Sequence, residues 1–128
     1  MPTAYLRTIE DSDRLKDAFA AGGRIAVVGA GWIGLEVAAA AREAGCDVTV
    51  FETAELPLLR VLGPTVAQIF ADLHREHGVD LRLGTSVSAG DLRGADLVVA
   101  GVGVSPRLDL ARSGGLAVDD GVLVDAGL

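Results

Sequence analysis

The chain has 128 residues, 50% of them apolar, and a net charge of −7 from 11 basic and 18 acidic side chains. This length fits one domain, and the apolar content excludes a disordered protein. The acidic balance argues against a nucleic-acid or anionic-membrane surface, which needs clustered positive charge. We find neither a membrane span nor a secretory signal, and a single cysteine excludes disulfides and cysteine zinc sites. We therefore expect a cytoplasmic protein.

The first half of the chain predicts a helix followed by one β-α-β unit. Asp11 or Ser12 can cap a helix over residues 8–21. The apolar run that follows lacks alternation, which is typical of a strand covered on both faces in a parallel sheet. An alanine-rich stretch without proline then predicts a second helix, and another apolar run predicts a second strand. The strand, helix and strand of this unit span residues 24–29, 32–44 and 47–52.

The second half predicts shorter elements. Pro64 suits the first turn of a helix that runs to about His77. We expect His74 and His77 on solvated surface rather than as metal ligands, and Cys46 as a small core filler rather than a nucleophile. The remaining predicted elements are strands over residues 79–83, 96–100 and 122–125 and a helical turn over residues 108–112. This order predicts an α/β, Rossmann-like doubly wound parallel sheet in three layers.

One motif carries chemistry. Residues 29–34, Gly-Ala-Gly-Trp-Ile-Gly, have the pattern G-x-G-x-x-G and lie between a strand and a helix, where this pattern binds dinucleotides. Gly29 would make the tight turn, Gly31 would let the backbone approach a pyrophosphate, and Gly34 would let the helix pack on the strand. The N–H groups at the start of the helix favour phosphates. No lysine follows the glycines, so the motif is not a P-loop.

A carboxylate completes the pattern. Glu52 ends the second strand, where it can accept hydrogen bonds from both ribose hydroxyls of the adenosine and would repel a 2′-phosphate. We therefore expect NAD(H) to be preferred over NADP(H), although Arg60 in the following loop could offset the repulsion. An S-adenosylmethionine site of the methyltransferase type, which uses a similar glycine-rich turn and acid, remains an alternative.

Five stretches of the chain together resemble one protein family. They are residues 6–11, 27–39, 57–63, 77–82 and 98–104. They resemble the NADH domain of FAD-dependent pyridine nucleotide-disulphide oxidoreductases. The class with the greatest similarity is that of the ferredoxin reductases, which includes putidaredoxin reductase, rubredoxin reductase and the ferredoxin reductases of dioxygenases. The resemblance covers nearly the whole chain.

The resemblance implies roles for individual residues. The glycine motif would hold the pyrophosphate, Glu52 the adenine ribose, and Glu36 the nicotinamide carboxamide. Residues 101–103 would run beneath the nicotinamide ribose, where small residues let the ring approach a flavin. Trp32 would be exposed where the family's flavin domain covers it. The predicted cofactor-binding residues are Gly29, Gly31, Trp32, Ile33, Gly34, Glu36, Glu52, Arg60, Gly101, Val102 and Gly103. We predict no catalytic and no metal-binding residue.

The resemblance also implies which part of the protein binds NAD(H) and which part binds the flavin. Residues 1–22 would be a linker and entry helix, and residues 23–128 the NAD(H)-binding domain. The family's flavin-binding and interface domains have no counterpart here. Residues 85–95 are shorter than the family's antiparallel excursion, so we expect that excursion to be shortened or missing. The chain would position NADH for hydride transfer to FAD in the flavin-binding domain of the same protein, which would serve a ferredoxin-type electron carrier. Alone it would bind without turnover. A stand-alone NAD(H)-sensing module is the alternative.

Overall fold

The structure is a computed structural model that describes residues 2–127, and it contains a five-stranded sheet in which every strand pair is parallel. The strands lie in the order β1-β5-β2-β3-β4. Their bounds are β1 (Thr3–Ala4), β2 (Arg24–Val28), β3 (Asp47–Phe51), β4 (Asp80–Arg82) and β5 (Leu97–Ala100). The helices are α1 (Ile9–Ala20), α2 (Trp32–Glu43), α3 (Leu59–Glu76) and α4 (Asp109–Ser113). The predicted Rossmann-like α/β fold is therefore confirmed.

Buried aliphatic side chains on β2 and β3 explain why these runs form the centre of the sheet. Val27 and Val50 are fully buried and face each other in the parallel register of β2 and β3. Small residues on α2, such as Ala38 and Ala41, let this helix lie close to the two strands, and both are fully buried. The predicted β-α-β unit is thus the core of the molecule.

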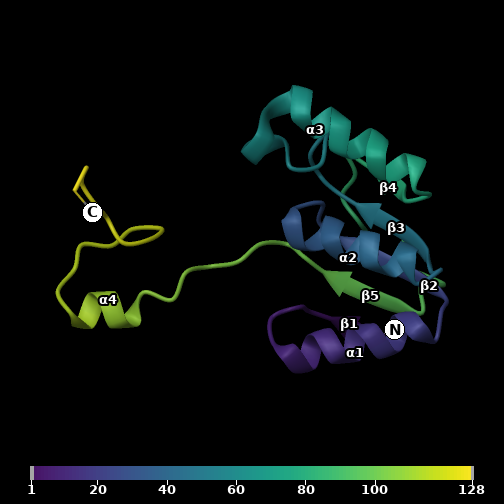
Figure 1. Cartoon of the computed structure of the whole chain (residues 1–128), viewed down its shortest axis with the longest axis horizontal. Coiled ribbons are helices and arrows are strands. Elements are labelled where there is room, and N and C mark those ends of the chain that lie inside the picture. The colour runs from purple at the N-terminus through teal and green to yellow at the C-terminus, as the bar shows by residue number, and fades with distance from the viewer. Residues whose placement is uncertain (1, 128) are drawn as a thin grey trace.

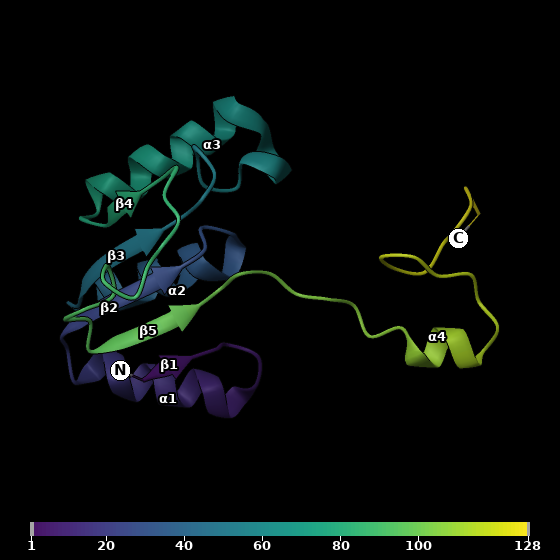
Figure 2. The same ribbon diagram turned by 180° about the vertical axis from the view of Figure 1, so that it is seen from behind.

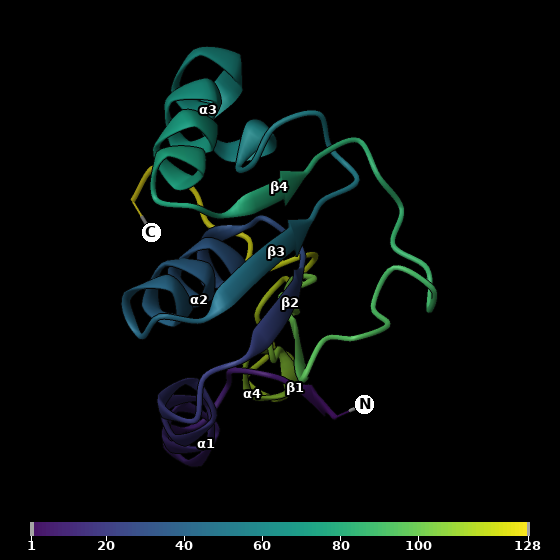
Figure 3. The ribbon, with the colours of Figure 1, turned by 90° about the vertical axis from the view of Figure 1, so that its right-hand side faces the viewer.

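All three longer helices cover one face of the sheet, as Figure 3 shows. The main hydrophobic cluster joins side chains of α1 and α2 to β2, β3 and β5, with α3 packed at its margin. Within residues 2–127, the hydrophobic cluster on the opposite face is covered by the loop between β4 and β5, whose Val87, Leu92 and Ala95 pack on Ala26 and Val98. The expectation of helices on both faces, which a doubly wound three-layer sheet implies, was therefore wrong for the described residues.

The antiparallel excursion, which we expected to be shortened or missing, is absent from the sheet within residues 2–127. Residues 83–96 form turns and irregular backbone, with no strand between β4 and β5. This segment crosses the sheet from β4, at one edge, to β5 on the far side of β2 and β3. Most of its residues are small or polar, and it crosses the sheet as one irregular segment.

Helix ends account for two further differences from the sequence prediction. Helix α1 is capped by Thr8, whose hydroxyl accepts from the Asp11 amide while the Asp11 carboxylate accepts from the Thr8 amide. Asp11 thus belongs to a capping box but is not the cap residue. Helix α3 begins at Leu59, before the predicted Pro64, and is kinked at Gly63, which has a φ of 70°. Pro64 starts the second, longer part, as its fixed φ favours.

Residues 102–127 form an arm that extends away from the sheet and carries α4 (Figures 1 and 2). Within the described residues, every hydrogen bond of the arm is made inside the arm. The strand predicted over residues 122–125 is wrong, because only an isolated antiparallel bridge between Val118 and Val122 forms there. A single short segment has no neighbouring strand on this arm to extend the pairing. No helix within residues 2–127 is long and apolar enough to cross a membrane.

Candidate functional site: a crevice at the ends of three strands

The carboxyl ends of β5, β2 and β3 meet at one edge of the sheet. The chain leaves β2 toward β3 on one side, whereas β5 lies on the other side, so this is the point where the strand order reverses. The Gly29 amide donates to the carbonyl of Phe51 at 2.8 Å, and the Gly101 amide donates to that of Val28 at 2.8 Å. In open α/β sheets, ligands bind in the crevice at such a point.

The packing of the chain itself requires glycine at positions 29 and 34. Gly29 has a φ of 101°, in the left-handed region that favours glycine. A Cβ on Gly29 would overlap the carbonyl oxygen of Gly101, and a Cβ on Gly34 would overlap the carbonyl oxygen of Gly29. The tight turn and the close approach of α2 to this turn therefore agree with the roles predicted from the motif.

Gly31 differs from these two glycines, because nothing in the fold requires it. Its φ is −78°, a value that every residue adopts readily, and no atom lies within 4 Å of the place where a Cβ would stand. Gly31 lines the crevice. The space in front of its backbone is therefore free for a ligand.

The first turn of α2 offers amide groups beside this free space. Gly31 is the N-cap residue and has no side chain to cap the helix. The Leu35 amide donates to the Gly31 carbonyl at 3.0 Å and is the first to make an intrahelical bond. The amides of residues 32–34 have no partner in their own helix, and together with the helix dipole they favour an anion.

The Glu52 carboxylate is held at the other side of the glycine turn. Its Oε2 accepts from the Ala30 amide at 2.7 Å, and its Oε1 accepts from the Ala54 amide at 2.9 Å and the Thr53 hydroxyl at 3.1 Å. Partial burial raises the pKa of Glu52, but these hydrogen bonds together lower it by more, so the pKa lies below its usual value. The side chain is therefore ionised at neutral pH and fixed in one orientation.

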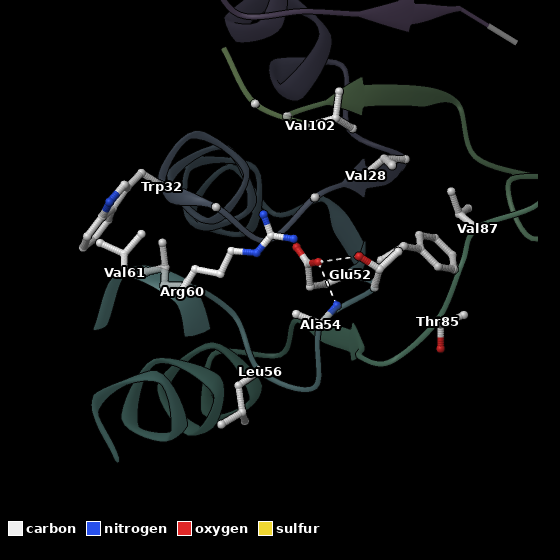
Figure 4. Close-up of a pocket in the computed structure, with 17 residues that line it drawn as sticks. Val28, Trp32, Glu52, Ala54, Leu56, Arg60, Val61, Thr85, Val87 and Val102 are labelled. Carbon is white, nitrogen blue, oxygen red and sulfur yellow. Dashed lines mark hydrogen bonds between the residues drawn. The ribbon is translucent and has the colours of Figure 1, made fainter. Parts of the chain in front are cut away.

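These features line one pocket of about 470 Å³, drawn in Figure 4. It contains eight of the eleven residues predicted to bind the cofactor, namely Gly29, Gly31, Trp32, Glu52, Arg60, Gly101, Val102 and Gly103. Ile33 and Gly34 do not line it, although they belong to the first turn of α2. A pocket of this size is typical of a small-molecule site.

Glu36 lies apart from this pocket. It is exposed on the side of α2 that faces α1, where it lines a separate groove with Lys16 and Leu15. Glu36 stands four residues after Trp32, so the two share a face of α2, but Glu36 is one helical turn farther from the glycine turn and lies beside α1.

Arg60 and Trp32 stand on the same side of Glu52 in the pocket (Figure 4). Arg60 extends from the first turn of α3, and within the described residues it forms no ion pair with Glu52. Trp32 is 47% exposed and packs edge-on against Phe70, with ring centroids 5.9 Å apart. It is therefore both exposed, as expected, and supported by the chain's own α3.

Several pocket residues were not predicted from the sequence. Thr85 and Val87 come just after β4, in the way that Glu52 comes just after β3. The rule that ligands bind at the carboxyl ends of strands could have identified them, had β4 been recognised as a neighbour of β3. The other unpredicted lining residues are Val28, Phe51, Thr53, Ala54, Leu56, Leu58 and Val61.

Two residues outside the pocket test the expectations for surface and core. His74 is only 9% exposed, so its expected place on solvated surface was wrong. Its Nδ1 lies 2.8 Å from the Phe70 carbonyl and its Nε2 lies 3.4 Å from the Leu35 carbonyl, so it bridges α3 and α2. Cys46 is fully buried in the main hydrophobic cluster, as expected of a core filler.

Comparison with known proteins identifies a family. The family model described as pyridine nucleotide-disulphide oxidoreductase matches residues 2–128. Rhodocoxin reductase of Rhodococcus erythropolis is 43% identical over 136 residues, which cover 94% of this chain and 32% of that protein. The anthranilate 1,2-dioxygenase system ferredoxin–NAD(+) reductase component of Burkholderia cepacia is 43% identical over 138 residues, which cover 96% of this chain and 34% of that protein.

The solved structures agree. The crystal structure of a covalent putidaredoxin reductase–putidaredoxin complex matches with a TM-score of 0.80 and 41% identity, over 93% of this chain and 33% of the matched chain. The chain thus spans about a third of the length of the relatives that it matches. The alignments with the two sequence relatives run over 136 and 138 positions, more than the 128 residues present here, so those relatives carry extra residues in the matched stretch.

Proposed function

Because this chain belongs to the pyridine nucleotide-disulphide oxidoreductase family, we propose that it is the NAD(H)-binding part of a ferredoxin reductase-type flavoprotein. The observation that carries the proposal is the pairing of Gly31 with Glu52 in one pocket. Gly31 leaves an open approach to the amides of α2, and Glu52 presents a fixed carboxylate on the other side of the turn. This spacing suits a pyrophosphate joined to a ribose.

The chemistry of Glu52 favours NAD(H) over NADP(H). An ionised carboxylate accepts hydrogen bonds from the 2′- and 3′-hydroxyls of the adenosine ribose. The same carboxylate would repel a 2′-phosphate at hydrogen-bonding distance, and the low pKa of Glu52 means that protonation does not relieve this repulsion at neutral pH. Among the described residues that line the pocket, Arg60 is the only cation, and we place it toward the pyrophosphate because it stands on the Trp32 side of Glu52.

The nicotinamide would lie at the opposite end of the pocket, beside Gly101, Val102 and Gly103. Two of these residues have no side chain and Val102 is 73% exposed, so the ring would have one face open. In the longer protein that open face would meet the flavin-binding domain, whose FAD would accept the hydride and pass electrons to a ferredoxin-type carrier. The part of this chain is orientation, and we expect the chain alone to bind NADH without turnover.

We still propose that Glu36 contacts the nicotinamide carboxamide, from outside the edge of the pocket. Because Glu36 lies outside the described pocket, its contribution would require the nicotinamide to extend past the first turn of α2. We therefore expect Glu36 to contribute less to binding than Glu52.

Calorimetric titration of the chain with NADH and NADPH tests the proposal. NADH should bind more tightly than NADPH, and Glu52→Gln should weaken NADH about 10-fold or more while narrowing the difference from NADPH, since it removes a charge-assisted acceptor of ~1.5–3 kcal/mol. Glu55→Gln is the matched control, because Glu55 is exposed, lies three residues away and does not line the pocket. Equal affinity of the unmodified chain for both dinucleotides would defeat the preference for NAD(H).

A further inference from the structure

We infer that the base end of this pocket accepts hypoxanthine as well as adenine, so that the site recognises the dinucleotide by its ribose and phosphates and not by its purine edge. The inference rests on the proposed function. It concerns the part of the pocket beyond Glu52, which is lined by residues that follow β3 and β4.

The sheet order fixes where the base would lie. A dinucleotide whose pyrophosphate is at the end of β2 and whose ribose is at the end of β3 continues toward β4, because the strands follow in the order β2-β3-β4. Thr85 and Val87, just after β4, line the pocket at this end. Figure 4 shows both on the side of Glu52 opposite Arg60 and Trp32.

Most side chains available to the base at this end carry no polar group. Ala54 and Val87 are both half-buried and offer apolar surface to the faces of a purine ring. Such surface binds adenine and hypoxanthine equally well, since the two bases have the same size and aromatic faces.

The two hydroxyl groups at this end already donate to the chain. The Thr85 hydroxyl donates to the Leu83 carbonyl at 3.1 Å, and the Thr53 hydroxyl donates to the Glu52 carboxylate at 3.1 Å. Neither proton is free for N1 of adenine or O6 of hypoxanthine. Among the side chains that line this end within the described residues, no other carries a donor.

Two backbone amides at this end are committed as well. The Thr85 amide donates to the Glu52 carbonyl at 2.9 Å, and the Gly84 amide donates to the Ala54 carbonyl at 2.8 Å. These bonds join the loops after β3 and β4, so breaking them to read a base would loosen the wall of the pocket. The edge of adenine carries an amino group and the N1 acceptor, and that of hypoxanthine carries a carbonyl and an N–H. Neither edge therefore meets a free side-chain donor or either of these two amides.

Comparative titration of the full chain tests this inference. We would measure by calorimetry the dissociation constants of NADH and of reduced nicotinamide hypoxanthine dinucleotide, and we expect them to agree within about threefold, because no hydrogen bond is gained or lost. A hypoxanthine form that binds 10-fold or more weakly would overturn the inference while leaving the proposed function intact. Absence of NADH binding would overturn both.

Thr85→Val provides the matched variant. It removes the hydroxyl and keeps the shape of the side chain, so it should change both dissociation constants by the same factor. If this variant alters their ratio 10-fold or more, Thr85 reads the base and the inference fails. Val87→Ala should weaken both dinucleotides in equal proportion, since it removes only apolar contact; a loss confined to one of them would likewise contradict the inference.

Discussion

Replacement of Gly31 by alanine separates the binding role of this residue from any structural role. Gly31 already has a φ of −78°, and a methyl group there would meet no atom of the chain within 4 Å. Alanine reduces the freedom of the unfolded chain, which stabilises by ~0.4–1 kcal/mol, and it is a poorer N-cap residue than glycine by a similar amount. The free energy of unfolding should therefore change by less than about 1 kcal/mol.

The effect on ligand binding should be much larger. The methyl group would stand in the open space that gives access to the amides of residues 32–34. Holding a pyrophosphate away from two amides would cost two charge-assisted hydrogen bonds of ~1.5–3 kcal/mol each, which corresponds to at least about 100-fold weaker binding of NADH. Gly34→Ala should instead lower the stability of the fold, because its methyl group would overlap the Gly29 carbonyl oxygen. We expect this overlap to destabilise the fold by ~1–3 kcal/mol or more.

Urea unfolding and calorimetric titration of the same samples would measure both effects. Gly90→Ala is the matched control, because Gly90 lies outside the pocket and a Cβ there would meet only the Ser88 hydroxyl at 3.4 Å. The control should bind NADH as the unmodified chain does. If a folded Gly31→Ala chain bound NADH within about threefold of the unmodified chain, the reasoning about the open approach would be refuted.

Two further predictions concern acid and the buried histidine. The pKa of Glu52 is lower in the folded chain than its usual value, so ionised Glu52 stabilises the fold at pH values above the pKa that it has in the unfolded chain, and this contribution is lost as the pH falls through the folded pKa. The difference in unfolding free energy between the unmodified chain and Glu52→Gln should therefore shrink from pH 7 to about pH 3. A difference that stays constant over this range would contradict the lowered pKa of Glu52. His74→Ala should lower the unfolding free energy by ~2 kcal/mol or more, because it opens a cavity between α2 and α3 and removes the ring that bridges the Phe70 and Leu35 carbonyls. His77→Ala should have little effect, because His77 is exposed. If both variants lost the same stability in a thermal melt, the burial of His74 between α2 and α3 would be contradicted.

The central part of the fold was predictable because local signals and long-range packing agree there. Unbroken apolar runs gave β2 and β3, and glycines ended the elements between them. The position of Glu52 followed from its place at the end of a strand, without knowledge of any contact. The sequence could therefore predict both the glycine turn and its carboxylate.

Features that depend on neighbours distant in the chain were not predictable in the same way. His74 lies in a polar-looking helix end, yet its ring is buried because α2 packs across it and supplies a carbonyl. The three long helices lie on one face because β1, β2, β3 and β4 follow in one direction across the sheet through right-handed crossovers. The chain reverses direction between β4 and β5, and this connection crosses the other face as a loop. The base end of the pocket depends on β4 pairing with β3, which periodicity alone does not specify.

The strand predicted over residues 122–125 shows that a local sequence pattern does not by itself determine strand pairing. The short apolar run of Val122, Leu123 and Val124 favours extended backbone, but a strand needs a partner edge. On the arm the available partner is Val118, through a single bridge, and the apolar side chains of Leu123 and Val124 remain exposed. A local preference for extended backbone did not produce a strand here, because no neighbouring strand lies on the arm.

The most direct test of the central claim is an amide chemical-shift titration of the labelled chain with NADH. The account predicts the largest changes at Ala30, Trp32 and Thr53, smaller changes at Gly103, and none at the exposed start of α1. Changes at these amides would place the phosphates and the ribose on either side of the glycine turn. If NADH caused no change there, or changes only in a separate groove lined by Arg42, His74 and His77, the pocket would not be a dinucleotide site.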